Sequence, residues 1–217
     1  MGQKRTLTRV DSASGTTMRD LEARKRILSV THEMLISQSY IKVTIGGVAT
    51  NAGVGKATIY RTWPNKPALV LDVLRDRFPE VPTADLGDSR AEMLATARTL
   101  AKLFGLREVR AALPGLIADT TESPGLEDTL RDNLIGARKK RSAECLHRAL
   151  ERGDLPAGTD VSMVLDSWAG LMLFRCLFFG DTLDEAEVER LVDATLMTPP
   201  RLPHPPAGPI GPGDILP

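Results

Sequence analysis

Residues 44–63, TIGGVATNAGVGKATIYRTW, contain two short amphipathic stretches separated by three residues. Residues 44–52 and 56–63 are each predicted to be helical. The Gly53-Val54-Gly55 sequence between them is long enough only for a tight turn. Two short helices joined by a turn of three residues that contains glycine are typical of a helix-turn-helix.

The side chains of this segment separate into an apolar set and a polar set. The apolar set is expected to hold the two helices together and consists of Val48, Ala49, Ala52, Val54, Ile59 and Trp63. The polar set of the second helix consists of Lys56, Thr58, Tyr60 and Arg61. A surface helix with cations and hydroxyl groups suits the major groove of DNA, where phosphates flank the base edges. An ordinary helical hairpin with a solvated polar face has the same spacing and stays open as an alternative.

Charge is unevenly distributed along the chain, although 28 Lys and Arg residues balance 28 Asp and Glu residues. Residues 1–78 contain 13 basic and 6 acidic residues, a net charge of +7. Residues 79–217 contain 15 basic and 22 acidic residues, a net charge of −7. A basic N-terminal third indicates contact with a polyanion such as DNA. Random variation in surface composition is the alternative.

The rest of the chain has the apolar periodicity of helices and contains no alternating strand pattern of useful length. Helices are expected at residues 18–37, 66–78, 89–104, 106–120, 124–152, 160–180 and 184–197. Residues 1–17 have no apolar period and are expected to form a disordered arm. Residues 198–217 contain eight Pro and three Gly, which predicts a loose tail.

Several residues are expected to begin or interrupt these helices. Asn65 is predicted to cap the helix that follows it, and Ser123-Pro124 to begin another. Pro114-Gly115 is predicted to break the 106–120 helix. Thr182 and Glu185 have the spacing of a capping box.

Length and composition narrow the class of protein. A chain of 217 residues with 42 % hydrophobic residues is long enough to bury a core without metals or disulfides. It has no run of 18 apolar residues and no apolar stretch in its basic N-terminus, so neither a membrane partner nor secretion is expected. Its two cysteines, Cys145 and Cys176, are predicted to be buried thiols in a reducing cytoplasm.

Residues 44–69, TIGGVATNAGVGKATIYRTWPNKPAL, closely resemble the DNA-binding domain of TetR-family transcriptional regulators. The resemblance runs from near Arg24 to about Leu74, and a looser one covers residues 166–196. It implies an all-α fold, with an N-terminal three-helix helix-turn-helix domain followed by a helical ligand-binding and dimerisation domain. The expected divisions are an arm at 1–17, a DNA-binding domain at 18–65, an effector-binding and dimerisation domain at 66–197 with a connecting helix at 66–78, and a tail at 198–217.

The resemblance also implies which residues contact DNA. Base edges are expected to meet Lys56, Ala57 and Arg61, and the phosphate backbone Thr44, Thr58, Tyr60 and Lys66. The chain departs from the family pattern at Gly55, which stands where a serine commonly caps the recognition helix and should weaken that cap. Gly46 and Gly47 are expected to loosen the preceding helix.

The function implied is that of a sequence-specific regulator, a cytoplasmic homodimeric repressor that a small apolar effector releases from a near-palindromic DNA operator. The expected ligand-binding residues are Leu100, Leu103, Phe104, Met163, Trp168, Met172 and Phe174. The expected dimer interface contains Leu171, Phe178, Phe179, Val188, Leu191 and Val192. No cofactor, metal site or catalytic residue is expected.

Two other classes of function stay open beside this one. The chain is alternatively a DNA-binding activator or architectural protein without an effector, or a helical enzyme. The sequence Gly53-Val54-Gly55-Lys56-Ala57-Thr58 has part of a phosphate-binding loop, but Thr50 and Ala57 stand where that motif requires glycine and a hydroxyl residue.

Overall fold

The computed structural model describes residues 18–78, 80–122, 125–126, 128 and 135–203. These residues are helical, apart from loops and one isolated β-bridge between Thr159 and Arg201. The helices are α1 (Met18–Gln38), η1 (Tyr40–Lys42), α2 (Ile45–Ala52), α3 (Lys56–Tyr60), α4 (Lys66–Arg75), α5 (Ser89–Gly105), α6 (Arg107–Glu122), α8 (Ala137–Arg152), α9 (Val161–Phe174), η3 (Arg175–Phe179) and α10 (Glu185–Met197). The predicted arm, the predicted Ser123-Pro124 cap and most of the predicted tail lie outside the described residues.

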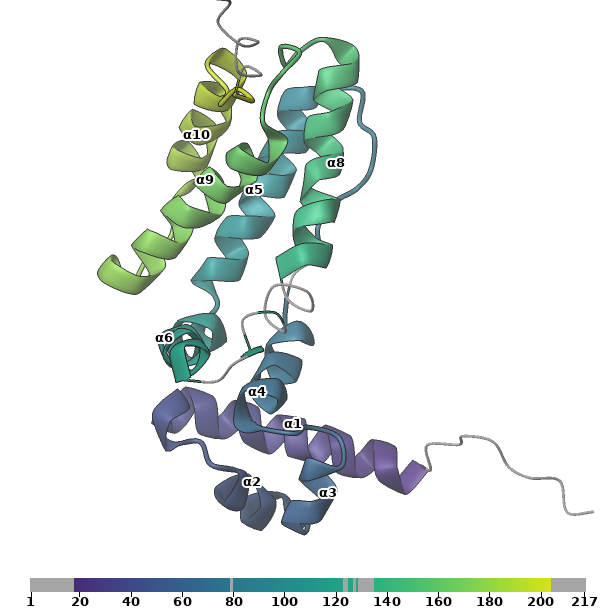
Figure 1. Cartoon of the computed structure of the whole chain (residues 1–217), viewed down its shortest axis with the longest axis vertical. Helices are drawn as coiled ribbons and strands as arrows, with labels where there is room; N and C mark the ends of the chain where they lie inside the picture. Colours follow the sequence, from purple (N-terminus) through teal and green to yellow (C-terminus); the bar gives the residue numbers. More distant parts are fainter. Residues whose placement is uncertain (1–17, 79, 123–124, 127, 129–134, 204–217) are drawn as a thin grey trace, which may run out of the picture.

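The molecule is elongated, with the helix-turn-helix at one end and a helical bundle at the other (Figure 1). Helices α1, α2 and α3 form the first end, and α5, α8, α9 and α10 form the bundle. Helix α4 leads from one to the other, and α6 contacts both α1 and α5. The arrangement confirms the predicted all-α class.

Two clusters of buried apolar side chains correspond to the two ends. The first cluster contains side chains of α1, α2, α3 and α4 together with Val109, Ala112 and Leu116 of α6. It therefore extends past the domain division expected at residue 65. The second joins α5, α8, α9 and α10 around Trp168. Leu100 and Phe104 pack against both clusters, which makes α5 the structural link between them.

Helix α6 does not break at Pro114-Gly115, so that prediction is wrong. Pro114 is exposed, and it therefore places its ring towards solvent. Val109, Ala112 and Leu116 are buried on the other side of the helix. Their burial outweighs the local cost of a proline, which is about 3 kcal/mol in a helix interior.

Three other predicted boundaries need correction. Gly125 has a φ of 85°, in the left-handed region, so a continuous helix over 124–152 is excluded and the described part of α8 begins at Ala137. The recognition helix α3 is shorter than predicted and ends at Tyr60. The capping box of α10 is formed two residues later than predicted, by Asp184 and Glu187. Asp184-x-x-Glu187 matches the same sequence pattern as the predicted pair.

Helix α9 continues into a π-helical turn, and together they form one apolar rod. Its residues Val161–Phe178 are long and apolar enough to cross a membrane by length and composition, with a mean hydropathy of 1.5. The rod also contains Asp166 and Arg175, and α9 packs against α5 and α8. Within the chain 28 % of this stretch is buried, and Met163, Leu171, Phe174 and Phe178 leave an exposed apolar face.

The residues predicted to bind a ligand lie in two different environments. Trp168 and Met172 are 1 % and 0 % exposed and fill the core of the bundle, as the largely buried Leu103 fills the first cluster. Met163 and Phe174 are about half exposed on the outer face of α9, so they do not belong to the same packed core, and their role in ligand binding stays a prediction. None of the seven predicted residues lines the hollow beside Arg61 or the hollow between the end of α5 and the start of α10.

The predicted dimer residues also separate into two groups. Val188 and Val192 are 2 % and 0 % exposed because the apolar stripe of α10 packs against α5 in the same chain, so their assignment to a dimer interface is wrong. Leu191 is partly buried against the same core. Leu171, Phe178 and Phe179 are exposed, as an interface requires.

Candidate nucleic-acid interface

The helix-turn-helix is held by local hydrogen bonds that its sequence supplies. The Thr44 side chain caps α2 by accepting a hydrogen bond from the Gly47 N–H at 3.0 Å. Gly53 ends α2 with a φ of 64°, a left-handed conformation that favours glycine. Gly55 stands at the cap of α3 without a side-chain hydrogen bond, which confirms the weaker cap expected there.

The two glycines of α2 allow close packing. A side chain on Gly46 would lie 3.3 Å from Cε of Lys56, and one on Gly47 would lie 3.0 Å from Cε of Met34. An added Cβ at either position would therefore crowd the end of the Lys56 or Met34 side chain, and α2 runs without interruption from Ile45 to Ala52.

Recognition helix α3 has one buried side and one exposed side. Ile59 is fully buried in the first core cluster, beside Val48 and Ala49 of α2. Lys56, Ala57 and Tyr60 are exposed, and Thr58 is partly exposed. A helix of five residues has little stability of its own. Its position is consequently fixed by the packing of Ile59 and by the residues that flank it.

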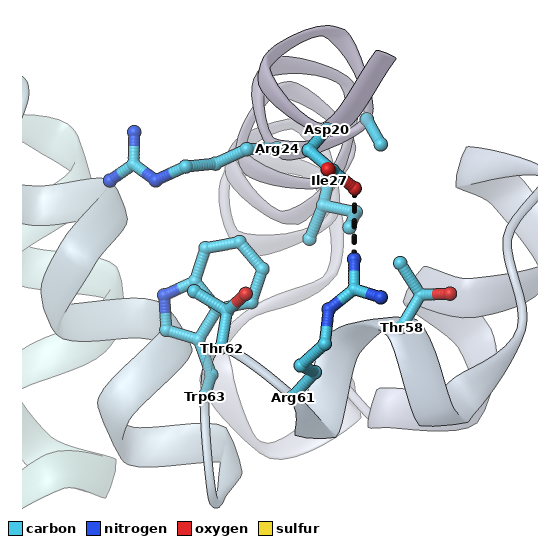
Figure 2. A pocket seen from close by; sticks show the side chains of 8 residues that line it. Asp20, Arg24, Ile27, Thr58, Arg61, Thr62 and Trp63 are labelled. Carbon is cyan, nitrogen blue, oxygen red and sulfur yellow. Dashed lines mark hydrogen bonds and ion pairs between the residues drawn. The ribbon is translucent and has the colours of Figure 1, made fainter. Parts of the chain in front are cut away.

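Arg61 directly follows α3 and is held by an acidic residue of α1 (Figure 2). Its Nη2 donates a hydrogen bond to Oδ1 of Asp20 at 3.0 Å, and both side chains are well exposed. The pair lies at a hollow of about 280 Å³, the α1–α3 groove, lined by Asp20, Ala23, Arg24, Ile27, Thr58, Arg61, Thr62 and Trp63.

Asp72 of α4 forms hydrogen bonds with two of the residues that line this groove. Its Oδ2 accepts a hydrogen bond from Nη2 of Arg24 at 2.6 Å and another from Nε1 of Trp63 at 2.9 Å. Trp63 is buried, so its indole N–H needs such an acceptor. One carboxylate thereby ties α1 and the segment after α3 to α4.

Lys66 is the first residue of α4, and its ammonium group lies close to side chains of two other elements. Its Nζ lies 3.9 Å from the centre of the Tyr40 ring and 3.9 Å from Oδ2 of Asp119 in α6. The Tyr40 hydroxyl donates a hydrogen bond to the same oxygen of Asp119. Burial, and then the hydrogen bond to Asp119, raise the pKa of Tyr40 well above its ordinary value, so the hydroxyl stays protonated. Gly115 permits this contact, because an added Cβ would lie 2.1 Å from Cδ1 of Tyr40.

The predicted DNA-contact residues thus lie on α3, directly after it at Arg61, and at the start of α2 and α4. Sequence reasoning missed the acidic partners Asp20, Asp72 and Asp119. Asp20 is 41 residues from Arg61, and Asp119 is 79 residues from Tyr40. No spacing rule connects residues so far apart, so a sequence signal for these pairs was lacking.

An exposed cationic helix-turn-helix joined to a second helical domain is typical of DNA-binding transcriptional regulators. The family model for bacterial regulatory proteins of the tetR family matches residues 27–73. The model for the tetracyclin repressor-like C-terminal domain matches residues 83–195. The chain therefore belongs to the TetR family of transcriptional regulators.

Relatives and a solved structure agree with this family. The DNA-binding transcriptional repressor TetR of Mycobacteroides abscessus is 32 % identical over 178 residues, 79 % of this chain and 90 % of that protein. The uncharacterised regulator YdeS of Bacillus subtilis is 29 % identical over 175 residues, 80 % of this chain and 88 % of that protein. The crystal structure of the TetR-family regulator SCO0332 is 30 % identical with a TM-score of 0.63, covering 81 % of this chain and 97 % of that one.

Proposed function

We propose that this regulator reads its operator with the exposed side of α3 and the residues that flank it. The base contacts are assigned to Lys56, Ala57 and Arg61, and the backbone contacts to Thr44, Thr58, Tyr60 and Lys66. The observation that carries the proposal is the shared exposure of cations and hydroxyl groups around α3, beside a core that fixes the helix. Guanidinium and ammonium groups bind guanine edges, and hydroxyl groups and lysines bind phosphates.

The functional unit of this proposal is a homodimer formed through the outer face of α9. This face carries Met163, Leu171, Phe174, Phe178 and Phe179, which are between 39 % and 73 % exposed. The Phe174 ring centre lies 5.1 Å from that of Phe178 and 5.6 Å from that of Phe179, so the three rings form one patch. Contiguous exposed apolar surface of this kind marks an interface. A two-fold dimer presents one α3 to each half of a near-palindromic site.

Repression, with release by a small apolar effector in the cytoplasm, completes this proposal. It is supported by the name of the Mycobacteroides abscessus relative, a DNA-binding transcriptional repressor. It is also supported by α5 and α6, which connect the bundle to the helix-turn-helix and offer a route for coupling. Release requires that the effector bind a conformation with the wrong spacing between the two α3 helices more tightly.

A second candidate function is regulation without an effector. It is favoured by the packing of the bundle, where Trp168, Met172 and Leu146 are almost completely buried. If these side chains fill the core of the bundle, little space remains for a ligand, and an activator or an architectural DNA-binding protein would fit. Screening small apolar metabolites for release of bound DNA separates the two candidates.

The test of DNA recognition is selection from a random duplex library with the full-length chain. We expect enrichment of a near-palindromic sequence whose half-sites lie about one helical turn apart, roughly 34–36 Å. Sedimentation of the chain with the selected duplex should show two or another even number of chains per site. Failure to enrich any sequence would contradict the proposal.

A further inference from the structure

The two arginines of the α1–α3 groove are held in different ways. Arg24 reaches Asp72, and its guanidinium points away from Arg61 in Figure 2. Arg61 reaches Asp20 through Nη2. The Asp20 side chain is 43 % exposed and that of Arg61 is 65 % exposed, so the Arg61 pair remains accessible to DNA.

The guanidinium group of Arg61 can donate hydrogen bonds to Asp20 and to a base at the same time. A guanidinium has five N–H donors arranged as a planar fork. The hydrogen bond to Asp20 comes from one end of this fork, at Nη2. The remaining donors suffice for the two acceptors that guanine presents in the major groove. A carboxylate at one end of the fork fixes its plane.

The negative charge of Asp20 also affects which groups of the DNA can approach Arg61. An arginine beside a duplex has abundant phosphates as competing partners, and these carry no information about sequence. The Asp20 carboxylate occupies the groove next to Arg61 and repels a phosphate that approaches there. Repulsion of wrong partners is a common source of specificity.

We propose that Asp20 is a specificity-determining residue, which holds Arg61 for base recognition and keeps it from binding the phosphate backbone. The inference rests on the proposed function, since it requires that Arg61 read a base. It assigns a role in DNA recognition to the first turn of α1, outside the helix-turn-helix itself.

The test compares Asp20→Asn with wild type on a duplex selected from a random library and on a scrambled duplex. Loss of the carboxylate should raise affinity for the scrambled duplex and lower the ratio of specific to non-specific affinity by about three- to tenfold. The non-specific salt slope should steepen by about one unit, as expected for one added phosphate contact. Asp20→Glu, which keeps the charge, should retain most of the ratio.

Glu22→Gln is the matched control, because Glu22 is an exposed acid of the same helix that does not line the groove. It removes the same charge and should leave the ratio unchanged. Introduction of Asp20→Asn into an Arg61→Ala background should also leave the ratio unchanged. Equal effects of Asp20→Asn and Glu22→Gln, or an undiminished effect without Arg61, would overturn the inference.

The same data separate this inference from the proposed function. If wild type does not distinguish the two duplexes, or Arg61→Ala leaves the ratio intact, the proposed role of Arg61 fails and the inference fails with it. If Arg61→Ala lowers the ratio and Asp20→Asn does not, only the role of Asp20 is overturned. Melting temperatures of all variants should match wild type, because both members of the pair are exposed.

Discussion

The exposed faces of α3 and α9 differ in chemistry, and the difference indicates two kinds of partner. Helix α3 presents a small polar face with Lys56, Tyr60 and the flanking Arg61. Helix α9 and its π-helical extension present a large apolar face with Phe174 and Phe178. A polar cationic face is solvated by water and attracts a polyanion, whereas a contiguous exposed apolar face marks an interface with another apolar surface.

The two faces also differ in how they are held. The five-residue α3 buries only Ile59, and the segment after it is held through Arg61 and Trp63 by hydrogen bonds to Asp20 and Asp72. Helix α9 is fixed by burial of its own inner side, where Trp168 and Met172 lie. Substitutions at the DNA face should therefore change recognition with little change in folding, and substitutions at the apolar face should change assembly.

Phe178→Glu should have the largest effect. It places a charge where the proposed dimer interface removes water, without a partner for that charge. Loss of the dimer should reduce operator affinity by roughly 10²–10⁴-fold, because two linked half-sites no longer bind together. Sedimentation and operator titration measure both losses. Leu86→Glu is the control, since Leu86 is 59 % exposed in the loop before α5 and is not part of the proposed interface. A dimeric Phe178→Glu would place the interface elsewhere.

Arg61→Ala should have the next largest effect, and only on specific binding. Loss of a bidentate contact to guanine should cost about 1–3 kcal/mol and relax preference at one base pair in each half-site. Competition between selected and scrambled duplexes measures this difference. An equal loss on both duplexes would assign Arg61 to a phosphate instead.

Glu92→Gln should destabilise the bundle that supports α9. The carboxylate accepts hydrogen bonds from Arg148, Arg152 and the Leu86 N–H, and its side chain is 2 % exposed. Burial alone would raise the pKa of Glu92, but these donors outweigh it and lower the pKa to about 2. Glutamine removes the anion that Arg148 and Arg152 share and leaves Arg152 paired with Asp85 alone, which should reduce the free energy of unfolding by about 1–3 kcal/mol at neutral pH.

The pH dependence of stability provides a second check on Glu92. Because its pKa is lowered in the folded state, its contribution is present above its ordinary value of 4.5 and is lost as the pH falls towards about 2. Wild type and Glu92→Gln should therefore converge in acid in urea-unfolding experiments. Glu151→Gln, an exposed control on α8, should follow wild type throughout. A constant difference between wild type and Glu92→Gln at every pH would exclude the ionised carboxylate as the cause.

Lys66→Ala should have the smallest effect, since this lysine is shared with Tyr40 and Asp119. Affinity should fall by a similar factor on all DNA sequences, and the salt slope should decrease by about one unit. Titration at several salt concentrations measures the slope. Lys102→Ala, an exposed lysine at the end of α5, should change neither quantity. An unchanged slope in Lys66→Ala would remove Lys66 from the DNA interface.

Local signals predicted most of the fold. Asn65 caps α4 as expected, with its side chain accepting from the Ala68 N–H at 2.8 Å, and Thr44 caps α2 at the expected start of the helix-turn-helix. Cys145 and Cys176 are buried and free, as predicted. These features depend on residues three or four positions apart or on side-chain chemistry alone, so the sequence contains them.

The remaining features depend on contacts between distant residues. Whether Pro114 breaks a helix depends on what its neighbours bury, and whether Val188 faces a partner depends on the position of α5. The pairing of Arg61 with Asp20 is likewise fixed only when α1 packs beside α3. Periodicity predicts which residues share a face of a helix, but tertiary packing decides what that face contacts.

Base recognition by Arg61 is tested most directly by replacing each guanine of the selected operator in turn with 7-deazaguanine, which lacks the N7 acceptor. The affinities of wild type and Arg61→Ala are then measured for each duplex. We expect one guanine in each half-site whose replacement weakens wild-type binding and leaves Arg61→Ala binding unchanged. Equal losses for both proteins at every guanine, or no loss at any, would contradict the role of Arg61 at the base edges.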